Sequence, residues 1–188
     1  MGTTCRILTI CGSLRAGSSN AAVLETARAV APEGVAVGGY AGLAALPHFN
    51  PDDDTEPLHP AVADLRARIR AADALLFSTP EYAGALPGSF KNLLDWTVGG
   101  GETYHKPVAW INASASQTGA ADAHDSLRKV LARTGTDIVE AACAHIPVPR
   151  PAVGPDGRIG DPALRQQIAA VLQTLAEHCE RGDEAATA

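Results

Sequence analysis

Short runs of consecutive apolar residues recur along this chain, and a segment with helical spacing separates each run from the next. The runs lie at 5–11, 73–80, 106–114 and 136–149, with a weaker one at 35–40. Strands that face water on one side alternate apolar and polar residues, and these runs do not. Strands that are apolar throughout are typical of a parallel sheet covered by helices on both faces.

The intervening segments repeat apolar residues at the spacing of helices that bury one face. These helices are expected over 23–30, 60–69, 87–98, 127–131 and 164–179. Five strands and five helices fit one α/β domain with a flavodoxin-like, doubly wound, five-stranded parallel sheet. We expect this domain to cover residues 1–180 and residues 181–188 to form a frayed tail.

In a doubly wound sheet, ligands bind outside the carboxyl ends of the strands, near the point where the strand order reverses. The loops that follow the first, third and fourth strands, at 12–20, 78–96 and 112–121, are therefore expected to form the functional site.

Composition limits the classes of function. The chain has 188 residues and a net charge of −6, with no run of Lys and Arg, so no nucleic-acid partner is expected. No apolar stretch is long enough to span a bilayer and the first residues lack the features of a signal peptide, so a cytoplasmic protein without membrane association is expected. The four cysteines have no metal-site spacing, and no metal is expected.

The first loop is rich in hydrogen-bond donors. The stretch CGSLRAGSSN, residues 11–20, offers Ser13, Ser18, Ser19 and Asn20, and Arg15 adds a charged fork suited to phosphate. One Ser or Asn is enough to cap a helix without any ligand. A cap alone does not explain Arg15 or the number of hydroxyls, so the loop is predicted to bind a phosphate.

Three known kinds of phosphate loop do not match. Gly12 and Gly17 have the spacing of a P-loop, but Ser18 stands where that loop has lysine. The dinucleotide-binding pattern G-x-G-x-x-G is absent. Small phosphotyrosine phosphatases place an arginine six positions after the nucleophilic cysteine, and six positions after Cys11 is Gly17.

The second and third loops are less specific when each is taken alone. Pro80 and Gly84 indicate a rigid turn that approaches a ligand closely, or an ordinary connection into the helix at Pro87. The stretch 112–121, NASASQTGAA, is small and polar, as in a solvated loop that caps the next helix.

Taken together, the segments GSLRAGSSN and PEYAGALPGSFKNLLDW resemble the NADPH-dependent FMN reductase family, which includes quinone, chromate and azo reductases. The family patterns are G-S-L-R-x-x-S-x-N and P-E-Y-N-x-x-x-P-x-x-L-K-N-x-x-D-W. The segment 106–131 is similar to a third family segment, and the resemblance covers about residues 5–179.

The resemblance implies a flavodoxin-like fold, bound FMN and NADPH or NADH as electron donor. It implies phosphate binding by Ser13, Arg15, Ser18, Ser19 and Asn20. It also implies contacts to the flavin ring from two further groups of residues, which are Pro80, Glu81, Tyr82, Ala83 and Gly84, and Ser114 and Ser116.

This chain departs from the family at three places near the ring. Ala83 stands where the family has Asn, which removes a polar contact, and Phe90 replaces a Leu, which changes packing. Ser116 and Ala120 stand where glycines are common, which is expected to reshape the pocket. Glu81 is interpreted as part of the turn, since hydride transfer needs no specific protein acid.

The sequence therefore predicts an NAD(P)H-dependent oxidoreductase that passes hydride through FMN to a quinone, a free flavin, or a chromate or azo-dye acceptor. The resemblance further implies a homodimer or homotetramer. Two alternatives stay open at this point, a flavodoxin-type electron carrier without its own substrate and a phosphatase that depends on Cys11.

Overall fold

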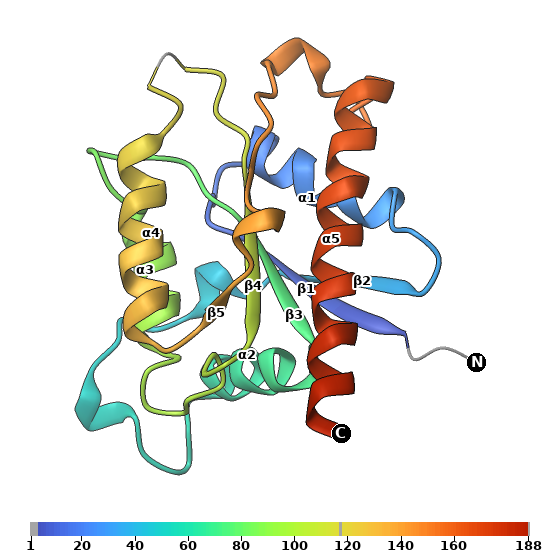
Figure 1. The fold of residues 1–188 in the computed structure, drawn as a ribbon. Helices are drawn as coiled ribbons and strands as arrows, with labels where there is room; N and C mark the ends of the chain where they lie inside the picture. The colour runs from blue at the N-terminus through green and yellow to red at the C-terminus, as the bar shows by residue number, and fades with distance from the viewer. Residues whose placement is uncertain (1–3, 117, 188) are drawn as a thin grey trace.

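Five parallel strands form the centre of the protein in the order β2-β1-β3-β4-β5 (Figure 1). The structure is a computed structural model that describes residues 4–116 and 118–187. The strand order reverses direction at β1, as in a doubly wound flavodoxin-like sheet, which confirms the predicted fold class. The strands are β1 Cys5–Cys11, β2 Val35–Tyr40, β3 Ala74–Ser78, β4 Pro107–Asn112, β5 Asp137–Ile138 and a short β6, Ala144–His145, which also pairs with β4.

Helices cover both faces of the sheet, as the apolar strands required. On β3, Leu76 packs into the core beneath α1 and α5, whereas Leu75 and Phe77 pack into the core beneath α2, α3 and α4. Every residue of β3 is buried, which explains why this strand does not alternate. The helices are α1 Ser19–Ala29, α2 Pro60–Ala71, α3 Gly88–Asp95, α4 Ala121–Arg133 and α5 Pro162–Thr187.

The fifth strand differs from the prediction of one strand over 136–149. It is divided into β5 and β6 by a short 3-10 helix, η3, at Glu140–Ala142. β5 ends opposite Val108 and β6 begins opposite Ile111, so residues 139–143 span the same length of sheet as two residues of β4. These extra residues leave the plane of the sheet and bury Ala142 against the core that α5 covers.

The closing helix is longer than predicted. It was expected over 164–179, and α5 continues to Thr187, into the segment expected to be a tail. Fraying of 181–188 stays a prediction. Among the described residues, no helix is both long enough and apolar enough to cross a membrane.

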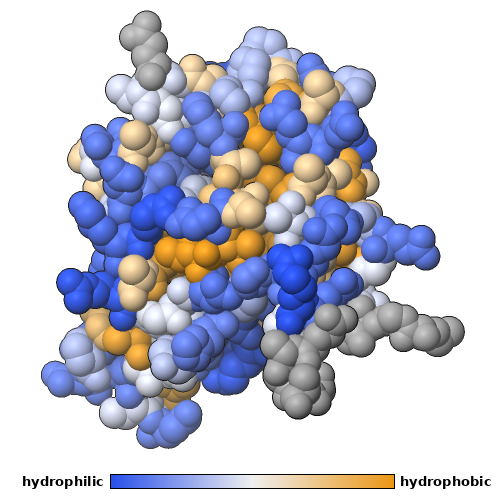
Figure 2. All heavy atoms as spheres, in the orientation of Figure 1, coloured by the Kyte–Doolittle hydropathy of each residue, from blue (hydrophilic) through white to orange (hydrophobic). Residues whose placement is uncertain are grey.

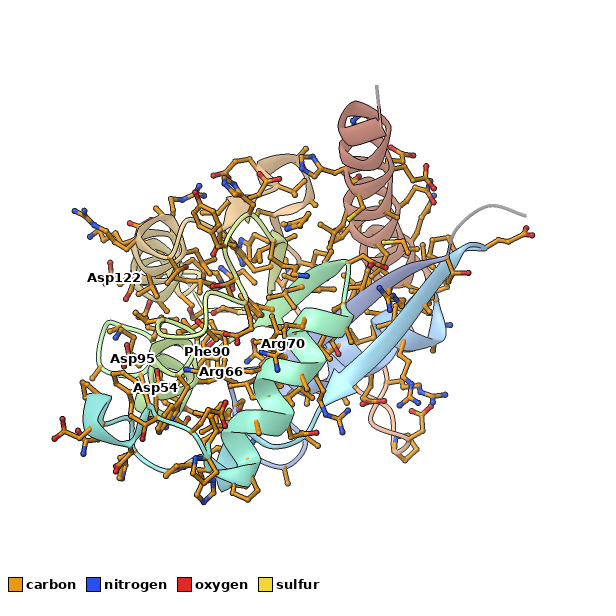
Figure 3. All side chains as sticks on the ribbon, turned by 90° about the horizontal axis from the view of Figure 1, so that it is seen from below. Asp54, Arg66, Arg70, Phe90, Asp95 and Asp122 are labelled. Carbon is orange, nitrogen blue, oxygen red and sulfur yellow. The ribbon has the colours of Figure 1, made fainter. Side chains whose placement is uncertain are left out.

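A buried group of charges fixes the loop that connects α3 to β4. The guanidinium of Arg66 contacts Asp54 at 2.8 Å and donates to the backbone carbonyl of Trp96 at 2.9 Å. Figure 3 shows Asp54, Arg66 and Arg70 on the same side of the molecule. Glu102, whose side chain is 2% exposed, accepts from Arg70 at 2.7 Å. Arg66 is therefore paired although it is buried, which is the condition for tolerating a charge inside a protein.

Candidate functional site

A pocket of about 420 Å³ opens at the carboxyl ends of β1, β3 and β4. The three loops predicted to form the site meet there, because parallel strands end at the same edge of a sheet. A fourth segment, which follows β6, completes the wall. The lining residues are Arg15, Ser19 and Asn20, then Thr79, Pro80 and Glu81, then Ala113, Ser114, Ala115, Ser116 and Ala120, and finally Val148, Pro149 and Arg150.

Two hydroxyls of the first loop bind their own backbone. Ser18 caps α1, because its Oγ accepts a hydrogen bond from the N–H of Ala21 at 3.1 Å. Ser13 Oγ accepts from the N–H of Arg15 at 3.2 Å. Neither residue lines the pocket, and Ser18 serves as a helix cap. Of the residues predicted in this loop, those that line the pocket are Arg15, Ser19 and Asn20.

The backbone of the first loop presents unused donors. The backbone N–H groups of Ala16, Gly17, Ser19 and Asn20 donate to no acceptor in the part of the chain that the structure describes, and of these residues Ser19 and Asn20 line the pocket. They lie at the N-terminus of α1, where the helix dipole is positive. Arg15 is exposed, and no described carboxylate lies within ion-pair distance of its guanidinium. This end of the pocket is suited to an anion.

Asn20 is buried and held at the pocket wall. Its Oδ1 lies 2.9 Å from Ser78 Oγ on β3, and the single proton of that hydroxyl is shared with the carbonyl oxygen of Ile111, 2.8 Å away. Its side-chain N–H groups have no acceptor among the described residues. Asn20 lines the pocket, so its amide is within reach of a bound ligand.

The second loop contains a tight turn. Tyr82 and Ala85 exchange backbone hydrogen bonds of 3.1 and 3.2 Å. Ala83 and Gly84 lie between them, with φ of 52° and 70°. Two central residues with positive φ are typical of a type I′ turn, in which Asn-Gly is the favoured pair. This backbone favours the Asn that the family pattern has at this position, and Ala83 adopts a conformation that alanine disfavours.

The tip of this turn does not line the pocket. Tyr82 is 53% exposed, and Tyr82, Ala83 and Gly84 do not line the cavity. Pro80 and Glu81, at the base of the turn, do line it. Of the five ring contacts expected from this loop, the structure brings these two to the pocket wall.

Glu81 connects the second loop to the helix that follows the third. Its Oε2 accepts a hydrogen bond from the backbone N–H of Ala123 at 3.1 Å. Ala120, at the N-cap of α4, has φ of 52° and no side-chain cap. Glu81 therefore provides the missing cap from another loop, and its negative charge lies at the positive end of the helix dipole.

The third loop is organised by its own hydroxyls. Ser114 Oγ lies 2.9 Å from Ser116 Oγ, and Asn112 Oδ1 accepts from the N–H of Ser114 at 3.0 Å. His145 Nε2 lies 2.8 Å from the carbonyl oxygen of Ser114, which ties the loop to β6. Ser114 and Ser116 both line the pocket, as does the buried Ala120.

The segment after β6 was missed by the sequence analysis, because 136–149 was interpreted as one strand. Ser19 Oγ donates to the carbonyl oxygen of Val148 at 3.2 Å. The N–H of Val148 in turn donates to the carbonyl oxygen of Ala113 at 3.1 Å. These two bonds fix the segment between the first and third loops. The signal for it was the Pro-Arg pair at 149–150, at the carboxyl end of the last strand.

Cys11 is placed poorly for a nucleophile. Its Sγ donates to the carbonyl oxygen of Ser13 at 3.6 Å, and the residue does not line the pocket. Burial raises the pKa of the Cys11 thiol, and a protonated thiol is a weak nucleophile. These observations argue against the Cys11-dependent phosphatase.

A doubly wound sheet with an anion site after β1 defines this protein as a flavodoxin-like nucleotide-binding protein. The family described as NADPH-dependent FMN reductase matches residues 5–147. The chain belongs to this family, and it is an NAD(P)H-dependent oxidoreductase with FMN as its cofactor.

Individual relatives agree with this assignment. An NAD(P)H-dependent FMN reductase of Pseudomonas aeruginosa is 36% identical over 177 residues, which cover 93% of this chain and 95% of that protein. A quinone reductase of Escherichia coli K12 is 33% identical over 134 residues, which cover 70% of this chain and 71% of that protein. The solved structure of FerB, a flavoenzyme NAD(P)H:(acceptor) oxidoreductase from Paracoccus denitrificans, has a TM-score of 0.79 and 29% identity, and the match covers 92% of this chain and 98% of that one.

The pocket has the donors that FMN requires. A phosphate needs cations and N–H donors, which Arg15 and the backbone N–H groups of Ser19 and Asn20 supply. The other lining residues include Pro80, Ala113 and Ala115, which bring apolar atoms beside polar ones, as a flat heteroaromatic ring needs.

Proposed function

We propose that the first loop binds the phosphate of FMN and that the second and third loops hold its ring. The observation that carries this proposal is that Arg15 and the acceptor-free backbone N–H groups of Ser19 and Asn20 belong to residues that line one pocket. When bound, FMN supplies the hydride chemistry between NAD(P)H and the acceptor. The residues assigned to FMN are those expected from the family: Ser13, Arg15, Ser18, Ser19, Asn20, Pro80, Glu81, Tyr82, Ala83, Gly84, Ser114 and Ser116.

Within this proposal, the residues have separate tasks. Arg15 and the backbone N–H groups of Ser19 and Asn20 bind the phosphate, and Ser13 and Ser18 shape the loop that presents those groups. Asn20 donates to the ligand near the ribityl chain. Pro80, Ser114 and Ser116 position the ring, and Glu81 holds their two loops together.

The test is selectivity for FMN over riboflavin, which lacks the phosphate. Arg15→Ala is expected to raise the dissociation constant for FMN about ten- to hundred-fold, since a charge-assisted hydrogen bond contributes about 1.5–3 kcal/mol. Riboflavin binding is expected to stay unchanged. Flavin fluorescence titration measures both ligands, with circular dichroism as the control for folding. Equal affinities of the wild type for FMN and riboflavin would contradict the phosphate assignment.

We further propose that quinones and free flavins are the electron acceptors, with chromate and azo dyes as further candidates. The small side chains of the third loop support a site that does not select one acceptor, because they provide few specific contacts. NAD(P)H and the acceptor would then use the same face of the flavin in turn. Initial-rate plots at several NADPH and quinone concentrations are expected to be parallel, and intersecting lines would exclude a shared face.

A homodimer or homotetramer in the cytoplasm completes the proposal. Val98 and Tyr104 are 60% and 63% exposed and line a second pocket, of about 590 Å³, between α3 and α4. Large exposed apolar side chains around one hollow are common at subunit interfaces. Light scattering after size-exclusion chromatography measures the mass, and a Tyr104→Glu variant is expected to be monomeric. A mass that corresponds to a monomer for the wild type would refute the proposed homodimer or homotetramer.

A further inference from the structure

Arg150 is a second cation in the pocket that the sequence analysis did not assign to any role. It lies far from Arg15 in the chain, at the start of the short helix η4, Arg150–Ala152, and both arginines line the same pocket. Arg150 is exposed, and no described carboxylate lies within ion-pair distance of it. Its guanidinium is therefore available to a ligand.

The backbone before Arg150 is fixed against the first loop. Ser19 belongs to the first turn of α1 and donates to the carbonyl of Val148, two residues before Arg150. A second bond joins Val148 to Ala113 at the end of β4. Arg150 consequently leaves the backbone beside the end of the pocket that carries the acceptor-free N–H groups, rather than beside the turn at Tyr82.

The charges of the pocket favour a dianion. Glu81 carries the one carboxylate among the described lining residues, and it accepts from the N–H of Ala123 at the positive end of α4. The whole chain carries a net charge of −6, so these two arginines form a local positive site on a negative protein. A phosphate monoester carries a charge of about −1.5 to −2 at pH 7, and Arg15 alone offsets about half of it.

We propose that Arg150 binds the FMN phosphate together with Arg15. The phosphate is then held by two arginines that lie far apart in the sequence, together with the backbone donors of the first loop. This inference rests on the proposed function, because it assigns the phosphate of FMN to the same end of the pocket.

The experiment compares Arg150→Ala with the wild type in flavin titrations without nicotinamide nucleotide. The FMN dissociation constant is expected to rise about tenfold, and the riboflavin dissociation constant is expected to stay unchanged. Arg158→Ala is the matched control, because Arg158 is also exposed, lies eight residues away and does not line the pocket. It removes the same charge and is expected to bind FMN as the wild type does.

The pH dependence gives a second readout. The second pKa of a phosphate monoester is about 6, so the loss caused by Arg150→Ala is expected to be larger at pH 7.5 than at pH 5.5. Unchanged FMN affinity in Arg150→Ala, or an equal loss for FMN and riboflavin, would overturn the role of Arg150. If Arg15→Ala also left FMN binding unchanged, the phosphate assignment itself would fail, which separates the two proposals.

Discussion

Replacing Glu81 tests whether this residue joins the second loop to α4, the helix that follows the third loop, as the structure indicates. In Glu81→Ala, α4 loses the one side-chain acceptor that the described residues place at its N-terminus, because Ala120 provides none. Loss of a cap costs about 0.5–2 kcal/mol, and loss of a charge at the helix dipole costs about 0.3–1 kcal/mol. For a partly buried carboxylate, these contributions give a destabilisation of about 1–2 kcal/mol, or a decrease in Tm of about 3–6 °C in a protein of this size.

Two further variants separate the hydrogen bond from the charge. Glu81→Gln keeps an acceptor oxygen and is expected to lose only about 0.3–1 kcal/mol. Asp122→Asn removes a charge from the first turn of the same helix without removing the cap, and is expected to resemble Glu81→Gln. Asp122, which Figure 3 labels, belongs to the first turn of α4. Urea unfolding of the FMN-free protein measures the free energy of unfolding of all three variants. Wild-type stability of Glu81→Ala, or an equal loss of stability in Glu81→Gln and Glu81→Ala, would refute capping of α4 by Glu81.

Three other substitutions test particular backbone and packing features. Ala83→Asn is expected to stabilise the protein by about 1 kcal/mol, because Asn accepts positive φ more readily, and an unchanged urea midpoint would contradict strain in this turn. Gly12→Ala is expected to destabilise it by about 1–3 kcal/mol, since the new Cβ would lie 2.7 Å from the Cβ of Thr79; wild-type stability would show that the two loops separate freely. The hydroxyl of Tyr40 is buried without a partner among the described residues, and burial raises the pKa of Tyr40 to about 12. The unfolded tyrosine ionises near pH 10, so the free energy of unfolding should fall as the pH rises from 10 to 12, and Tyr40→Phe should remove that decline and add about 1 kcal/mol at pH 7. Unfolding curves at pH 7, 10 and 11 measure both effects, and an unchanged decline in Tyr40→Phe would exclude Tyr40 as its source.

The sequence predicted the fold well because burial on both faces leaves a clear pattern in β1, β3 and β4. It failed at residues 136–149, where a run of apolar residues is equally compatible with a strand and with the buried turn at η3. The pattern indicates burial there. Only the pairing with β4 reveals that the segment holds three more residues than a continuous strand would need.

The first loop was predicted from its residue types, and the structure refined which of them face the pocket. Ser18 and Asn20 are both polar and close in sequence, but the geometry of α1 uses one as a cap and directs the other to the pocket. Arg150 was missed because its approach depends on hydrogen bonds of Val148 that join distant segments. No local pattern records such long-range contacts.

Because the pocket wall is assembled from residues 15 to 150, it exists only when most of the chain is folded. FMN consequently binds the native state and not the unfolded chain, and by mass action its concentration sets part of the stability. Free FMN at a hundred times its dissociation constant adds about 2.7 kcal/mol to the free energy of unfolding. Flavin supply in the cell would thereby influence how long this protein survives proteolysis, and release of flavin fluorescence would report loss of the whole domain rather than of one loop.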